Sequence, residues 1–192
     1  LTYSDTGKLK TITYPGIGLV TYHYDARDWL KRINGPLGDT LYHYDSAGQL
    51  IEQTDPQAFT VRYAYDAVGN LNKLTYPDDK EVTYTYDALN RLETVTTWLN
   101  QTTTYYYDDA GRLDYRDNFN GTRTEYGYDD ANRLTLLTHK KSDGTLIAHY
   151  VFELDANGNR QRETGEQPIT PTPILGATFY DYNLQRNRLE SS

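Results

Sequence analysis

Apolar and polar residues alternate in short runs along most of the chain, and each run is bounded by residues that favour turns. In one such run, Val61, Tyr63 and Tyr65 fall on one side of an extended chain, whereas Arg62 and Ala64 fall on the other. A period of two residues is typical of a β-strand whose two faces meet different surroundings. The pattern therefore predicts a protein built from many short strands.

One unit, Tyr-x-Tyr-Asp-x-x-(Gly/Asn)-x-Leu, recurs along the chain with little variation. Its second tyrosine, which we call the anchor, is followed directly by Asp and six residues later by Leu. Successive anchors are 20 or 21 residues apart, and they are Tyr24, Tyr44, Tyr65, Tyr86, Tyr107 and Tyr128. Six copies in register exclude a chance origin, so the repeat is the unit of the architecture.

Each unit predicts one hairpin. After the anchor, the Asp side chain can accept a hydrogen bond from the backbone N–H two residues later, and the Gly or Asn tolerates a positive φ. This segment therefore predicts a turn. A second strand begins at the Leu and ends in another turn, such as Asn34-Gly35-Pro36 or Asp55-Pro56-Gln57. Leu is often followed three residues later by a second apolar residue, as at Leu71 and Leu74, and a β-bulge after the first turn would reconcile this spacing with a strand.

A single hairpin cannot bury its apolar face, so neighbouring repeats must stack. We expect the fold class to be all-β, with tandem two-stranded hairpin repeats forming a continuous, twisted and curved antiparallel sheet. One array of about eight repeats would occupy residues 1–192, with a Pro-containing loop over 164–178 between degenerate C-terminal repeats. The anchors would then form a ladder with a pitch of about 9.6 Å, because neighbouring strands lie about 4.8 Å apart.

The composition agrees with a thin β structure. Only 37% of the residues are hydrophobic and the mean hydropathy is −0.80, so a thick two-layer core is poorly supplied. Tyr nevertheless occurs 20 times, and disordered chains are usually poor in aromatic residues. A tyrosine ring packs while its hydroxyl still requires a partner, which suits a sheet with one face wetter than the other.

The net charge of −8 disfavours nucleic acid as a partner, because phosphate binding requires a basic patch. It equally disfavours adsorption to anionic membranes, and no apolar run is long enough to insert into one. The absence of cysteine excludes disulfides, thiolate metal sites and cysteine nucleophiles. The chain begins at Leu1 rather than Met, and we expect it to be an internal fragment whose targeting signals lie elsewhere.

The repeated aspartates invite an acid–base interpretation, but a catalytic pair requires two different environments, and a repeated position gives every copy the same one. His23 and His43 occupy one slot in adjacent repeats, too far apart for a shared ion. His139 and His149 flank a hairpin and make at best a weak metal site.

Residues 155–159, Asp-Ala-Asn-Gly-Asn, resemble half a calcium loop, although their Gly fits the turn of the repeat instead. No nucleophile-elbow, phosphate-loop or dinucleotide motif occurs. We therefore predict no catalytic residue, no metal and no cofactor. The one candidate binding surface is the tyrosine ladder of Tyr24, Tyr44, Tyr65, Tyr86, Tyr107 and Tyr128.

The copies YDSAGQL at Tyr44, YDALNRL at Tyr86, YDDAGRL at Tyr107 and YDDANRL at Tyr128 resemble the YD repeat of the Rhs family, over nearly the whole chain. That family includes bacterial polymorphic toxins, insecticidal toxin-complex components and the animal teneurins. The resemblance implies a strip of β-sheet that spirals into a hollow shell, which encloses a C-terminal toxin domain in the bacterial members and serves adhesion in the teneurins. The family's PxxxxDPxGL-type motif, linked to self-cleavage, is missing from this sequence.

The expected function is that of a non-catalytic structural segment of a larger bacterial protein, secreted or on the cell surface. Its partners would be flanking YD repeats of the same parent chain and an enclosed toxin domain or other cargo. The alternative is a cell-adhesion or carbohydrate-binding module that uses the tyrosine-rich face. An enzyme is disfavoured, because the array contains no catalytic cluster.

Overall fold

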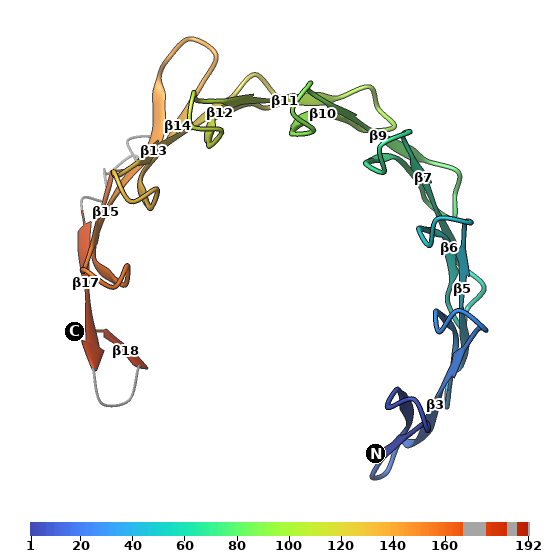
Figure 1. The fold of residues 1–192 in the computed structure, drawn as a ribbon. Coiled ribbons are helices and arrows are strands. Elements are labelled where there is room, and N and C mark those ends of the chain that lie inside the picture. Colours follow the sequence, from blue (N-terminus) through green and yellow to red (C-terminus); the bar gives the residue numbers. More distant parts are fainter. Residues whose placement is uncertain (167–175, 184–187, 192) are drawn as a thin grey trace. The chain divides into compact units, whose positions relative to one another are not determined.

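The computed structural model describes residues 1–166, 176–183 and 188–191, which form β-strands joined by turns. They fall into two compact units, Leu1–Arg91 with Thr97–Leu99, and Leu92–Thr96 with Asn100–Ser192. Figure 1 labels the strands in chain order. The first unit contains β1 (Thr2–Tyr3), β2 (Leu9–Tyr14), β3 (Gly18–Tyr24), β4 (Leu30–Gly35), β5 (Gly38–Tyr44), β6 (Leu50–Thr54), β7 (Thr60–Tyr65), β8 (Leu71–Thr75) and β9 (Glu81–Tyr86). The second contains β10 (Leu92–Thr96), β11 (Thr102–Tyr107), β12 (Leu113–Asp117), β13 (Arg123–Tyr128), β14 (Leu134–Lys140), β15 (Leu146–Leu154), β16 (Arg160–Glu166), β17 (Gly176–Asn183) and β18 (Arg188–Ser191).

Within each unit, every strand pairs antiparallel with the next one along the chain. This holds from β1 to β9 in the first unit. It holds equally from β10 to β18 in the second. The prediction of an all-β fold made of tandem two-stranded hairpins in an open antiparallel sheet is confirmed.

A β-bulge follows the first turn of the repeat, as the spacing of apolar residues predicts. In β7 and β8, Tyr65 pairs with Leu71, whereas the preceding Ala64 pairs with Lys73, so Asn72 is an extra residue. The bulge puts Leu71 and Leu74 on one face although they are three positions apart. The same register shift recurs in the pairs β3–β4, β5–β6, β11–β12, β13–β14 and β15–β16.

The buried hydrophobic side chains lie on the face that carries the anchors, which we call the tyrosine face. Among residues 1–166, the buried hydrophobic side chains are Val82, Ala148 and Phe152, each 7% exposed. Val82 pairs with Leu74, and Leu74 pairs with Tyr63 on its other side, so apolar residues run across the strands of this face. The core is therefore a thin layer, as the composition indicates.

The opposite face, which we call the charged face, carries ion pairs between neighbouring strands. Arg62 lies 3.1 Å from Glu52, its direct partner in the pair β6–β7. Lys73 lies 2.9 Å from Glu81 across β8 and β9. Exposed pairs of this kind contribute about 0.2–1 kcal/mol each, so they specify the pairing of strands more than they stabilise the fold.

Two predicted boundaries require correction. Asn34 and Gly35 belong to β4, because the pairing of Gly35 with Gly38 leaves a turn of two residues, 36 and 37. The loop expected over 164–178 is shorter at both ends, because residues 164–166 lie in β16 and residues 176–178 in β17, where Thr164 pairs with Ala177. The remainder of that expected loop, 167–175, lies outside the described residues.

We call the turns at the other end of the strands from the Asp turns the distal turns, and several of them contain a residue in the same left-handed conformation as the Asp turns do. In the turn between β6 and β7, the N–H of Ala58 donates to the carbonyl of Asp55, and Ala58 has a φ of 66°. This left-handed conformation costs a residue with a Cβ roughly 1–2 kcal/mol. Asn and Gly fill the equivalent place in other distal turns, at Asn100, Gly121 and Gly144.

Replacing Ala58 with glycine is therefore expected to raise the free energy of unfolding by about 0.5–1 kcal/mol, since glycine relieves the strained φ at some cost in chain entropy. Urea denaturation of the two proteins measures the difference. Ala64→Gly, within β7, is the matched control and should lower the free energy of unfolding by about 1 kcal/mol. The extended backbone there has no strained φ for glycine to relieve, so only the cost in chain entropy remains. Equal shifts in the two variants would contradict the strain at residue 58.

Candidate functional site

Each anchor hydroxyl has a specific partner in the preceding repeat. The hydroxyl of Tyr65 donates to the backbone carbonyl of Leu50, the leucine of the preceding repeat, at 2.8 Å. The same bond joins every other anchor to the residue at the start of a strand in the preceding repeat: Tyr24 to Leu9, Tyr44 to Leu30, Tyr86 to Leu71, Tyr107 to Leu92 and Tyr128 to Leu113. The anchors thus tie consecutive hairpins together.

Burial raises the pKa of Tyr44, Tyr65, Tyr86 and Tyr128. The hydroxyls therefore stay protonated over the whole physiological range of pH, which keeps them hydrogen-bond donors to carbonyl groups. Loss of the hydroxyl would leave a half-buried carbonyl without a hydrogen-bond donor, which costs about 1–3 kcal/mol of stability. The ladder acts as a set of structural bonds, with its polar atoms already engaged.

The aspartate after each anchor closes the turn that follows, which we call the Asp turn. In the turn between β13 and β14, one oxygen of Asp129 accepts both the N–H of Ala131 and that of Arg133, each at 2.9 Å. Its other oxygen accepts a 2.7 Å bond from Nε of Arg133. Asn132, which precedes Arg133, has a φ of 61°, which explains why Gly or Asn occupies this position in most copies of the repeat. This geometry agrees with the turn-forming role predicted for the aspartate.

Such hydrogen bonds lower the pKa of the turn carboxylates Asp87, Asp108 and Asp129. At Asp129 the largest cause is the backbone N–H of Arg133, and the corresponding arginine N–H groups act in the same way at Asp87 and Asp108. A carboxylate with a lowered pKa favours the ionised form, so it makes a poor general acid or base at neutral pH.

The lowered pKa values predict acid sensitivity. Because the unfolded chain binds protons at higher pH than the folded chain does, the stabilisation is complete above the ordinary pKa of 3.8 and is lost as the pH falls below it. We expect the melting temperature to fall between about pH 5 and pH 2.5. The triple variant Asp87→Asn, Asp108→Asn and Asp129→Asn, whose amides still accept the backbone N–H bonds, should show a shallower fall. Parallel pH profiles for the two proteins would exclude this role.

The residue four places after the turn aspartate reaches the Asp turn of the next repeat. Nη1 of Arg112 donates to Oδ1 of Asn132 at 2.7 Å, and Nη1 of Arg133 donates to the carbonyl of Asp155 at 2.8 Å. The guanidinium of Arg112 also lies over the ring of Tyr128, 4.8 Å from its centroid. Sequence reasoning missed these links, although a long polar side chain at this position of several repeats was the available signal.

The structure does not bring the histidines together. His139 pairs with Ala148, and the neighbouring Thr138 pairs with His149, so the two imidazoles lie on opposite faces of the sheet. His139 contacts the buried Thr124 at 3.0 Å, and burial, followed by the charge of Arg116, lowers its pKa. His23 and His43 pair with different residues, Arg32 and Glu52.

The calcium-like segment is another Asp turn. One oxygen of Asp155 accepts the N–H groups of Asn157 and Asn159, both at 2.8 Å, and the other accepts the side-chain amide of Asn159. Within the part of the chain that the structure describes, no group of three or more His, Cys, Asp or Glu residues is placed to hold a metal ion.

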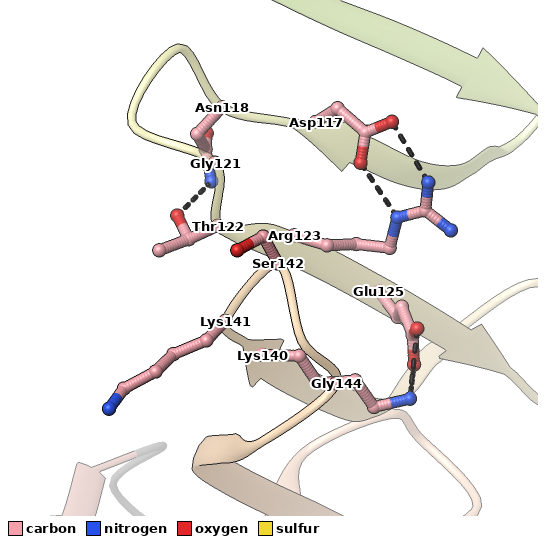
Figure 2. Close-up of a pocket in the computed structure, with 10 residues that line it drawn as sticks. All are labelled: Asp117, Asn118, Gly121, Thr122, Arg123, Glu125, Lys140, Lys141, Ser142 and Gly144. Carbon is pink, nitrogen blue, oxygen red and sulfur yellow. Dashed lines mark hydrogen bonds and ion pairs between the residues drawn. The ribbon is translucent and has the colours of Figure 1, made fainter.

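A charged hollow of about 530 Å³ lies beside two distal turns of the second unit, and Figure 2 shows its lining. Arg123 bonds both oxygens of Asp117, at 2.7 and 2.9 Å, and Lys140 bonds both oxygens of Glu125, at 2.9 and 2.7 Å. Lys141 extends away from both ion pairs (Figure 2). These four charges therefore neutralise one another in pairs.

None of the described segments forms a helix that is long and apolar enough to cross a membrane.

A family model described as RHS Repeat matches residues 3–40, 44–81 and 107–146, more than half of the chain. No curated protein sequence matches. Among solved structures, the crystal structures of TcdB2-TccC3 and TcdB2-TccC3-Cdc42 are each similar over 99% of this chain and 12% of theirs, with a TM-score of 0.73 and 17% identity. The Photorhabdus luminescens Tc holotoxin pore is similar over the same shares, with a TM-score of 0.54 and 17% identity. This level of identity shows a shared fold, and the chain spans about an eighth of the length of these structures.

Proposed function

Because the chain belongs to the RHS repeat family, we propose that it is a non-catalytic structural segment of a larger secreted protein and forms part of a β-shell that encloses a toxin or other cargo. Flanking repeats of the same parent protein would be its immediate partners. The likeness to a segment of TcdB2-TccC3 and of the Photorhabdus luminescens Tc holotoxin pore supports this proposal.

The main support for the proposal is that the repeated polar side chains form hydrogen bonds within their own turn or with a neighbouring repeat. The hydroxyl of an anchor such as Tyr65 bonds a backbone carbonyl of the preceding repeat, and a turn carboxylate such as Asp129 bonds its own turn. The arginine after the turn bonds the next repeat. Side chains whose polar atoms form hydrogen bonds within and between hairpins favour a structural role over a catalytic one.

Protease protection tests the proposal. In the full-length natural protein that contains these residues, the enclosed cargo should resist proteolysis until the shell is denatured. A variant that loosens the array, Tyr65→Ala, should make the cargo cleavable at lower urea concentration than the wild type. Lys141→Ala, at an exposed turn, is the matched control and should leave the protection unchanged. Cargo that is cleaved equally fast in native wild-type protein would contradict the shell function, as would a hydrolase activity that depends on one side chain of this segment.

The alternative, carbohydrate binding by the tyrosine ladder, has weaker support. A sugar-binding tyrosine uses its exposed ring face or its free hydroxyl, whereas the anchor hydroxyls already donate to backbone carbonyls and the rings are half-buried. Saturable binding to a glycan array would favour the alternative if Tyr→Ala changes along the ladder abolished it. Control variants that are changed elsewhere and are destabilised to the same extent should then still bind.

A further inference from the structure

The first unit presents an apolar residue in each of five successive distal turns. These residues are Ile17, Leu37, Phe59, Tyr76 and Trp98. Four of them are strongly exposed: Ile17 by 67%, Leu37 by 81%, Phe59 by 59% and Trp98 by 46%. Large apolar side chains gathered on one edge of a soluble protein mark an interaction site more often than isolated ones do. We call this row the aromatic edge.

The aromatic edge is hollowed where its rings come together. An open hollow of about 360 Å³ is lined by Phe59, Tyr76 and Trp98, together with Pro77, Asp78 and Lys80. The rings of Tyr76 and Trp98 meet edge to face, with their centroids 5.8 Å apart. Binding sites are typically lined by aromatic side chains with a few polar groups at the rim, as this hollow is.

Hydrogen bonds fix the backbone of the two turns that carry Phe59 and Tyr76. The N–H of Phe59 donates to a carboxylate oxygen of Asp55 at 2.9 Å, and the carbonyl of Phe59 accepts the N–H of Asp55. The N–H of Tyr76 donates to the carbonyl of Lys80 at 2.8 Å. A preformed site loses less conformational entropy on binding than a flexible one does.

The spacing of the edge selects a type of ligand. Successive distal turns are one hairpin apart, about 9.6 Å for two strands. A polyproline II helix rises about 3.1 Å per residue with three residues per turn, so it presents one face about every 9.3 Å. An extended strand presents one face about every 6.7 Å, and an α-helix about every 5.4 Å. A polyproline II segment therefore matches the spacing of the turns. The rings of Tyr76 and Trp98, whose centroids are 5.8 Å apart, would together form one contact site for it, and Phe59 would form the next.

The charges near the hollow select the sign of the ligand. Asp55, Asp78, Asp79 and Glu81 lie in or beside the two turns that carry Phe59 and Tyr76. Lys80 is paired with Asp78 at 2.5 Å and also lies over the ring of Trp98, 5.6 Å from its centroid. Lys73 is paired with Glu81 at 2.9 Å. Asp55 and Asp79 are therefore the two carboxylates in excess of the ammonium groups. A basic residue in the ligand complements this rim.

We propose that the aromatic edge around Phe59, Tyr76 and Trp98 binds a proline-rich, basic peptide segment in the polyproline II conformation. Proline rings stack on exposed aromatic rings, and proline-rich segments dock into aromatic-lined grooves because their conformation is already fixed. This binding site is separate from the tyrosine ladder and does not depend on the shell function.

Titration of the 192-residue chain with a synthetic peptide of three Pro-Pro-Arg units tests the proposal. Saturable binding should be visible by calorimetry below about 1 mM. Trp98→Ala and Phe59→Ala should each weaken binding about tenfold or more, since exposed aromatic anchors dominate such sites. Leu89→Ala is the matched control, because Leu89 is 71% exposed but lies in an Asp turn, and binding should be unchanged.

Two further ligands separate the outcomes. A peptide of the same composition with its prolines replaced by alanines should bind at least tenfold more weakly, since it lacks the fixed conformation. Binding of both peptides with equal affinity, or equal binding by the Trp98→Ala protein, would overturn the proposal. An oligosaccharide that binds through Trp98 while the proline-rich peptide does not would also overturn it. Circular dichroism of each variant confirms that the sheet is retained.

Discussion

Replacing Tyr65 with alanine is expected to lower the free energy of unfolding by about 3 kcal/mol. The change removes a half-buried ring from the tyrosine face, and it leaves the carbonyl of Leu50 without the donor that now lies 2.8 Å away. Tyr65→Phe removes the hydroxyl alone and should cost about 1 kcal/mol, the net value of one such hydrogen bond. Chemical denaturation of the three proteins measures both steps.

Tyr106 supplies the control for this prediction. It lies on the charged face, is 39% exposed and stacks on Tyr115 with ring centroids 4.3 Å apart. Tyr106→Phe keeps the stacked ring and should change the stability by less than about 0.5 kcal/mol. If the Tyr65→Phe protein were as stable as the Tyr106→Phe protein, the bond between repeats would not contribute to stability.

Replacing Gly48 with alanine should destabilise the first unit by about 2–3 kcal/mol. Gly48 has a φ of 89° in its Asp turn, where an L-residue is strained. A Cβ at this position would also lie 2.7 Å from Cζ2 of Trp29, the residue that reaches across from the preceding Asp turn. A shift of Trp29 would disturb its contacts with the guanidinium of Arg27, 3.8 Å from its ring centroid, and with the ring of Tyr44, 5.5 Å away between centroids.

Gly16→Ala separates the two causes. Gly16 has a φ of 77°, yet no atom lies within 4 Å of where its Cβ would be, so this change should cost about 1 kcal/mol from the backbone alone. The difference between the two variants measures the contact between repeats. In a Trp29→Ala background, the additional cost of Gly48→Ala should disappear. An unchanged cost in that background would exclude Trp29 as its cause.

Both predictions concern contacts between neighbouring repeats rather than within one hairpin. A repeat array is stabilised by the intrinsic stability of each repeat and by the interfaces between neighbours. Here the interfaces consist of the anchor hydroxyls, of the side chains that reach from one Asp turn to the next, and of the apolar rows on the tyrosine face. A single layer with few fully buried side chains depends on such bonds more than a thick core would.

The sequence alone determined the local elements. Period-two alternation located strands such as β7, and the Asp-x-x-Gly/Asn segments located the Asp turns, because both signals depend on a few consecutive residues. The spacing of Leu71 and Leu74 even predicted the bulge, since no straight strand places residues three apart on one face. The fixed interval between anchors determined that the hairpins repeat in register.

Only the tertiary structure decided what the repeated side chains bond to. The partner of an anchor hydroxyl, Leu50 for Tyr65, is fifteen residues away and depends on the register between β6 and β7. In the same way, the register of β14 and β15 placed His139 and His149 on opposite faces. Phe59, Tyr76 and Trp98 came together only because successive hairpins stack. Alternation along one strand fixes which face a residue occupies relative to its neighbours in sequence, whereas contacts across repeats depend on how neighbouring hairpins align.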